Sequence, residues 1–178
     1  MRVCVYGASS DSIDQIYFRE AKLLGRLMAE SGIELVFGGG QSGLMGACAE
    51  GLHQAGGHVT GIIPEFFNEP GVLYPHCDQV IITEDMSSRK KLMDEMSDGF
   101  IALPGGLGSY DELFESLTLR QIGRHSKPIA ILNTNDYYAP LYALLSHTAS
   151  TGFMNESAME SFCLCATPAE AVEHMLKG

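Results

Sequence analysis

The segment Phe100–Glu115 contains a glycine turn, a hydroxyl and two carboxylates in an order that suits a phosphate site. Its apolar start, Phe100–Leu103, predicts a short buried strand. The turn that follows, Gly105–Gly108, is rich in glycine, and Ser109 is expected to cap the next helix. Such a helix start presents unpaired backbone N–H groups and the positive end of the helix dipole. The turn therefore predicts phosphate binding.

Glu112 falls in the expected first turn of that helix, directly after Asp111. A carboxylate at this place is commonly a partner of the helix dipole and nothing more. Beside a bound phosphate, however, it would be repelled, which favours a chemical role. From residue type alone, both interpretations stay open.

Composition predicts one globular domain spanning residues 1–178, with 46% hydrophobic and 19% charged residues. The net charge of -11 argues against nucleic acid or an anionic membrane surface as partner. No apolar run approaches the length of a membrane span, and nothing resembles a signal peptide. Five cysteines without metal-ligand spacing indicate reduced thiols, so we expect a cytoplasmic protein without a metal or cofactor.

Apolar strand patterns alternate with helical periodicity along the whole chain. Strands are expected at residues 3–6, 33–37, 58–63, 79–83, 100–103, 128–132 and 162–165. Helices are expected at residues 13–31, 44–55, 89–97, 109–122, 136–150 and 167–176. A capping box of Ser12 and Gln15 would open the first helix, and Ser87 or Ser88 would cap the third. This order predicts a single-domain, Rossmann-like, doubly wound parallel α/β sheet of about seven strands with helices on both faces.

Three glycine-rich turns follow predicted strands, at Gly7–Ser10, Gly38–Gly43 and Gly105–Ser109. Ligands bind beyond the carboxyl ends of such strands, so the turns are expected to meet there, with Ser9 and Gly39 among the contacts. Neither the dinucleotide spacing G-x-G-x-x-G nor the P-loop is present, which favours a mononucleotide or sugar phosphate. Residues 64–77 could form a lid over this site or a packed surface loop.

The sequence PGGLGSYDE at residues 104–112 resembles the P-G-G-x-G-T-x-x-E signature of the LOG (Lonely guy) family. Further similarities follow in order at residues 38–46, 61–64, 86–90 and 125–128. These proteins are cytokinin riboside 5′-monophosphate phosphoribohydrolases, many long labelled lysine decarboxylases. The resemblance implies a Rossmann-like fold and a homodimer or larger homo-oligomer. It also implies hydrolysis of a nucleoside 5′-monophosphate, AMP or an N6-substituted AMP, to free base and ribose 5-phosphate.

The family's catalytic arginine and glutamate correspond to Arg89 and Glu112. The resemblance implies further substrate and phosphate contacts from Lys90, Gly105, Gly106, Leu107, Gly108, Ser109, Tyr110, Asp111 and Thr118. Cleavage of an N-glycosidic bond develops positive charge on the sugar, which a nearby carboxylate stabilises most in the transition state. Glu112 could equally take a proton from water or hold the ribose hydroxyls. Arg89 could orient Glu112 or stabilise the departing base.

This chain departs from the family pattern at several positions. Ser109 replaces a threonine but keeps the hydroxyl, whereas Leu119 and Arg120 replace a tryptophan and an alanine. The family's lid glutamate falls near Gly71, and Glu69 is the nearest substitute.

Two other functions remain as alternatives. A nucleotide or molybdenum-cofactor carrier would keep the glycine turns without needing the Arg89 and Glu112 pair. A decarboxylase would need a lysine that forms an aldimine with pyridoxal phosphate, and no lysine is placed convincingly for that.

Overall fold

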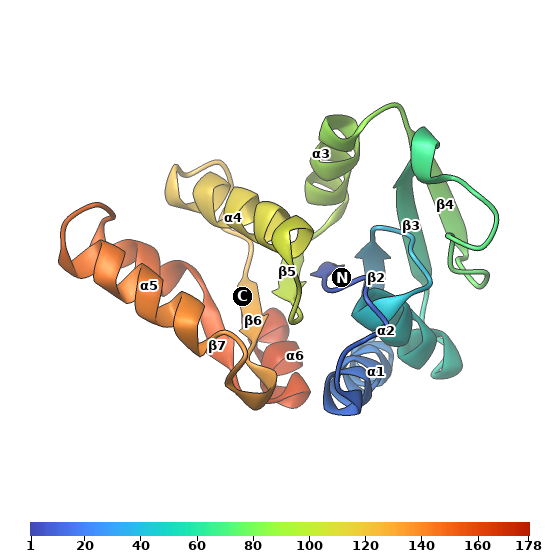
Figure 1. The fold of residues 1–178 in the computed structure, drawn as a ribbon, viewed down its shortest axis with the longest axis horizontal. Coiled ribbons are helices and arrows are strands. Elements are labelled where there is room, and N and C mark those ends of the chain that lie inside the picture. The colour runs from blue at the N-terminus through green and yellow to red at the C-terminus, as the bar shows by residue number, and fades with distance from the viewer.

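The computed structural model describes residues 1–178, and Figure 1 shows helices covering both faces of one sheet. The strands are β1 (Arg2–Tyr6), β2 (Glu34–Phe37), β3 (Val59–Pro64), β4 (Gln79–Thr83), β5 (Gly99–Ala102), β6 (Ile129–Leu132) and β7 (Cys163–Cys165). The α-helices are α1 (Gln15–Glu30), α2 (Gly43–Gln54), α3 (Met86–Met96), α4 (Leu107–Gln121), α5 (Ala139–Ser150) and α6 (Pro168–Lys177). Short 3₁₀ helices are η1 (Glu65–Phe67), η2 (Thr134–Asp136) and η3 (Glu156–Ser161).

All strands are parallel and lie in the order β4-β3-β2-β1-β5-β6-β7. After β4 at one edge, the chain returns to the centre, where β5 pairs with β1 and Tyr6 lies opposite Ala102. The strand order therefore reverses between β1 and β5. The predicted doubly wound parallel sheet is confirmed, and the crevice beyond these two strands is where such sheets bind ligands.

Alternation along the central strands divides the core into two layers. Val3 and Val5 of β1 pack with buried residues of α1, α2 and α6, whereas Cys4 and Tyr6 pack with residues of α3 and α4. Figure 1 shows the same division, with α1, α2 and α6 on one side of the sheet and α3, α4 and α5 on the other. None of these helices combines the length and apolar character needed to cross a membrane.

The predicted caps of the first and third helices are wrong. Asp14 caps α1 by accepting from the Ile16 amide at 2.9 Å, so Ser12 and Gln15 form no capping box. Asp85 caps α3 by accepting from the Ser88 amide at 2.7 Å, which places the predicted serines inside the first turn. In both places an aspartate separated from a predicted serine by one intervening residue supplies the acceptor for the free amides.

The start of α4 also differs from the prediction. Gly106 is its cap residue, and Ser109 lies inside the helix instead of capping it. The helix consequently begins two residues before Ser109, at Leu107, and Glu112 lies beyond the first turn. A role for Glu112 as a simple partner of the helix dipole is thereby weakened, because that effect falls off beyond the first turn.

Candidate active site

Backbone hydrogen bonds hold the glycine-rich turns together beyond the carboxyl ends of β1 and β5. The Ala8 amide donates to the Pro104 carbonyl at 3.0 Å, and the Leu44 amide donates to the Ala8 carbonyl at 2.8 Å. The turn after β1 is thus bonded both to the signature turn and to the start of α2. Together these segments and Gly38 surround one cavity of about 470 Å³, which we call the central cavity.

The start of α4 supplies the main-chain donors of the central cavity. Gly106, Leu107, Gly108 and Ser109 all line it, and their amides have no acceptor within the chain. Ser109 is buried, and its hydroxyl lies over Gly105, where an added Cβ would come within 2.1 Å of Oγ. The turn therefore requires glycine at 105 and presents amides, a hydroxyl and the helix dipole to an anion.

Arg89 reaches the same cavity from the first turn of α3 and is buried, with 7% of its surface exposed. Its Nε donates to the Ile62 carbonyl at 3.2 Å, and Nη1 lies 3.7 Å from the sulfur of Met86. Its Nη2 lies 3.2 Å from Oε1 of Glu112. The guanidinium is thus fixed in place by groups from β3, α3 and α4, as its planar set of donors allows.

Glu112 is as buried as its partner, with 8% exposed. Burial raises the pKa of this carboxyl, and the charge of Asp111 adds to the effect, whereas Arg89 and Lys90 act in the opposite direction. Desolvation therefore outweighs the ion pair, so the charged form of Glu112 carries a cost in free energy. A buried anion of this kind gains interaction with any positive charge that develops in the cavity.

Gly38 makes room for the guanidinium. A Cβ added at this position would lie 2.0 Å from Nη2 of Arg89, far inside contact distance. At the neighbouring Gly40, an added Cβ would meet only the methyl of Met45 at an ordinary 3.8 Å. The position of Arg89 therefore requires glycine at residue 38, in the second glycine turn. The sequence pattern did not reveal this role.

The loop between β3 and β4 lies along the central cavity and is bonded to the second glycine turn. The Gln41 amide donates to the Val72 carbonyl at 2.9 Å, and the Tyr74 amide donates to the Gly39 carbonyl at 2.8 Å. Tyr74 is further held by its hydroxyl, which donates to Glu50 at 2.7 Å. The lid interpretation of residues 64–77 is supported, because this loop contributes Phe67 and Val72 to the cavity wall.

Apolar side chains also line the central cavity. Besides Ala8 and Leu107, they are Met45, Ile63, Phe67, Val72 and Met86. An aromatic base and an apolar substituent fit such a wall, whereas a phosphate does not. None of these side chains except Leu107 was among the predicted contacts, because an apolar residue carries no local signal that distinguishes a cavity wall from the core.

The structure brings only part of the predicted contact set to the cavity. Ser9, Asp111 and the signature residues from Gly106 to Ser109 line it with Arg89 and Glu112. The predicted contacts outside the lining are Lys90, Gly105, Gly39, Tyr110 and Thr118. Gly105 and Gly39 are adjacent to lining residues, and their hydrogen bonds support the walls.

Lys90 and Thr118 face away from the central cavity. The ammonium of Lys90 pairs with Asp111 at 2.9 Å and with Glu115 at 2.7 Å, which raises its pKa. Thr118 is exposed and lies about three turns from the start of α4. Glu69, the candidate lid carboxylate, is also exposed and does not line the cavity.

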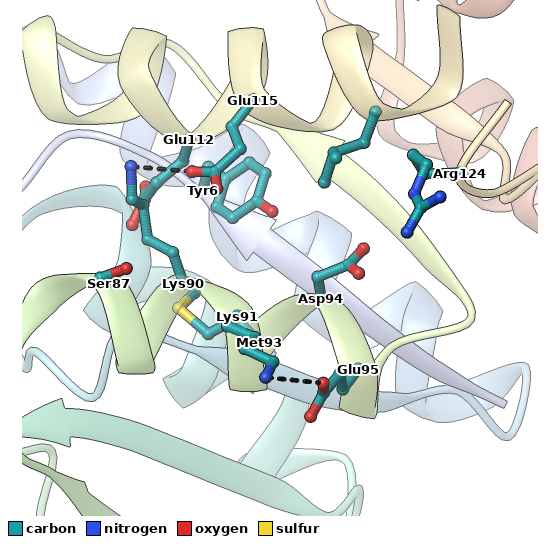
Figure 2. A pocket seen from close by; sticks show the side chains of 11 residues that line it. Tyr6, Ser87, Lys90, Lys91, Met93, Asp94, Glu95, Glu112, Glu115 and Arg124 are labelled. Atoms are coloured by element: carbon teal, nitrogen blue, oxygen red, sulfur yellow. Dashed lines mark ion pairs between the residues drawn. The ribbon is translucent and has the colours of Figure 1, made fainter. Parts of the chain in front are cut away.

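A second cavity of about 470 Å³ forms a groove between α3 and α4 (Figure 2). Figure 2 shows Lys90 reaching across this groove to Glu115, with Glu112 and Tyr6 beside them. Leu119 also lines it, at the position where the family has tryptophan. Arg120 instead donates to the backbone carbonyls of Ser126 and Lys127, so this departure stabilises the connection from α4 to β6.

No group of three or more histidine, cysteine, aspartate or glutamate side chains is arranged to hold a metal ion. His125 is the one histidine with buried, unpaired nitrogens, and its ring packs against Phe100 at 5.5 Å. Burial lowers the pKa of His125, which suits a neutral ring.

We predict that Glu112 titrates above its ordinary pKa of 4.5, because burial opposes its charge. Asp111→Asn should lower this pKa, since it removes a negative neighbour, and Lys90→Met should raise it, since it removes a positive one. Carboxyl carbon NMR during a pH titration measures all three values. A Glu112 resonance that titrates below 4.5 in the unmodified protein would contradict the burial argument.

The chain is similar in sequence to proteins of a known family. A family model described as "Possible lysine decarboxylase" matches residues 45–175. A probable cytokinin riboside 5′-monophosphate phosphoribohydrolase of Oryza sativa subsp. japonica is 38% identical over 174 residues, covering 98% of this chain and 71% of its own. The cytokinin riboside 5′-monophosphate phosphoribohydrolase of Rhodococcoides fascians is 41% identical over 150 residues, covering 84% of this chain and 76% of its own.

Solved structures with the same fold are more distant in sequence. The molybdenum cofactor binding protein from Rippkaea orientalis superposes with a TM-score of 0.76 at 23% identity, covering 99% of this chain and 95% of its own. At that identity the likeness shows the fold alone. The sequence relatives are much closer, and the chain belongs to the family of the cytokinin riboside 5′-monophosphate phosphoribohydrolases, whose model carries the lysine decarboxylase description.

Proposed function

We propose that this protein hydrolyses the N-glycosidic bond of a nucleoside 5′-monophosphate, AMP or an N6-substituted AMP, to free base and ribose 5-phosphate. The observation that carries the proposal is the buried Arg89–Glu112 pair, whose 3.2 Å contact lies in the same cavity as the free amides of α4. The names of the relatives support the same activity on cytokinin riboside 5′-monophosphates.

The phosphate would bind at the start of α4, where the amides of Gly106–Ser109 and the Ser109 hydroxyl converge. A dianion is attracted there by the helix dipole and by several hydrogen-bond donors at once. The base would then lie against the apolar wall formed by residues such as Phe67 and Met86. Between these two ends, the ribose comes next to Glu112.

In the reaction, the bond between C1′ and the base nitrogen breaks, and its electron pair leaves with the base. Positive charge develops on the sugar, and the buried Glu112 carboxylate stabilises it. The oxygen of a water molecule forms the new bond to C1′ and loses its proton, for which Glu112 is the nearest base. Protonation of the departing base completes the exchange.

Arg89 has two functions in this proposal. Its ion pair holds the Glu112 carboxylate in one orientation, which avoids reorganisation during the reaction. Its permanent positive charge also faces the cavity, where it stabilises the negative charge that moves onto the leaving base.

The alternatives fit the cavity less well. A decarboxylase that uses pyridoxal phosphate needs a lysine in the site, and no lysine lines the central cavity. A carrier needs no buried ion pair. Such a pair is costly to desolvate, and a catalytic role accounts for its presence here, whereas binding alone does not. The five cysteines are free thiols, which supports the cytoplasm as the place of this activity.

Replacing either member of the pair should abolish most turnover. We expect Glu112→Gln and Arg89→Ala to lower kcat/KM by about 10²- to 10⁴-fold, the usual worth of one such interaction. The assay follows free base and ribose 5-phosphate from a panel of nucleosides, monophosphates and diphosphates. The exposed Glu65→Gln is the matched control and should retain full activity. Binding of monophosphates without release of base by the unmodified protein would favour the carrier.

Gly38→Ala should impair catalysis through Arg89 alone. The added methyl displaces the guanidinium, so we expect kcat to fall by about 10- to 100-fold, as for other displaced catalytic groups. Gly40→Ala places a methyl in the same turn without touching Arg89, and a much smaller loss is expected. Equal losses for the two variants in steady-state kinetics would argue against this role of Gly38.

We further propose a homodimer or larger homo-oligomer, with α4 in the interface. Phe114 of α4 and Ile122, the residue directly after this helix, are large apolar side chains with 39% and 62% of their surfaces exposed, which supports a covered face. Light scattering during gel filtration should give at least twice the mass of 19.2 kDa. Phe114→Glu should shift the mass toward a monomer, whereas a monomeric unmodified protein would contradict the proposal.

A further inference from the structure

Leu103, Pro104 and Gly105 lead into the turn that is proposed to bind the phosphate. The carbonyl of each accepts a hydrogen bond from a residue outside this turn. The Tyr138 hydroxyl donates to the Leu103 carbonyl at 2.7 Å, and the Tyr137 hydroxyl donates to the Gly105 carbonyl at 2.7 Å. Between them, the Ala8 amide donates to the Pro104 carbonyl. Two neighbouring tyrosines from a distant part of the chain thus fix both ends of this short segment.

Fixing the Gly105 carbonyl also fixes an amide. The peptide unit is planar and trans, so the N–H of Gly106 points opposite to the carbonyl of Gly105. Because Tyr137 holds that carbonyl on one side, the Gly106 amide must point to the other side. Gly106 lines the central cavity, and its amide is the first of the series proposed to hold the phosphate.

The backbone that presents the tyrosines is strained. Asn135 and Asp136, directly before them, have φ values of 52° and 57°, in the left-handed region that ordinary residues avoid. The turn is held by the Asn133 side chain, which accepts from the Tyr138 amide at 2.7 Å and donates to Asp136 at 3.2 Å. Such strain persists where surrounding bonds enforce it, and it is common at functional sites.

The two rings diverge from this turn and pack within an aromatic cluster. Their planes are 88° apart, with centroids 5.0 Å from each other, and Tyr17 and Tyr110 pack against them. Tyr138 is wholly buried. Burial raises the pKa of Tyr137 to about 12 and that of Tyr138 further, so both hydroxyls keep their protons as donors at neutral pH.

We propose that Tyr137, supported by Tyr138, is a positioning residue for the substrate phosphate, which it orients through the Gly105–Gly106 peptide. It touches no substrate atom in this arrangement. The consequence for catalysis rests on the proposed function, whereas the effect on the Gly106 amide does not. A role in phosphate positioning should alter KM for phosphorylated substrates, and it should leave the chemical step at saturation nearly unchanged.

The test compares Tyr137→Phe with Tyr142→Phe, which removes a hydroxyl on α5 from a partly exposed ring that contacts Phe162. Loss of one positioning hydrogen bond should raise KM for AMP, and its Kd in calorimetry, by about 3- to 10-fold. The value of kcat should stay within about twofold. Tyr142→Phe should change neither constant, and thermal unfolding should show both variants folded. A fall in kcat at unchanged KM would overturn the proposal, as would an unchanged Kd.

A second measurement needs no substrate. In ¹⁵N relaxation experiments on the unliganded protein, Tyr137→Phe should lower the order parameter of the Gly106 amide, and Tyr142→Phe should not. Unchanged order at Gly106 would overturn the positioning role even if the protein were fully active. Conversely, loss of order at Gly106 in a protein that hydrolyses no monophosphate would uphold this role and refute the proposed reaction.

Discussion

The ion pair between Arg89 and Glu112 is the interaction on which the rest of the site depends. Both groups are buried, so each would be expensive to desolvate without the other. They meet only because the strand order reverses: α3 follows the edge strand β4, whereas α4 follows the central strand β5. The sheet topology thus brings two helix starts together across the crevice, and Gly38 leaves the space into which the guanidinium fits.

The site separates recognition by backbone from recognition by side chains. The cavity is lined by the residues whose amides begin α4, by apolar side chains from β3, α2, α3 and the loop before β4, and by the Arg89–Glu112 pair. This set of groups matches a molecule that has an anionic phosphate, a sugar that becomes cationic during reaction and an aromatic base, as the proposed nucleotide substrate does.

Much of the fold and the signature turn could be predicted from sequence, because apolar runs, glycine turns and helical spacing are local signals. The predicted caps were wrong at α1 and α3, where aspartates close to the predicted serines are the acceptors. Lys90 was expected as a substrate contact from the family resemblance, yet consecutive helix residues point about 100° apart, and Lys90 lies in the groove between α3 and α4. The support from Tyr137 is a tertiary contact without a local pattern, so no sequence reading could have found it.

The proposed recognition of the phosphate by the main chain has an evolutionary consequence. Peptide amides are the same whatever side chain is attached. The anion-binding end therefore tolerates substitution at every position except those, such as Gly105, where only glycine fits. The wall that faces the base consists of ordinary side chains, each of which one codon change can enlarge or shrink. Selectivity for the base can therefore diverge between proteins that descend from this fold, while their affinity for the phosphate stays constant.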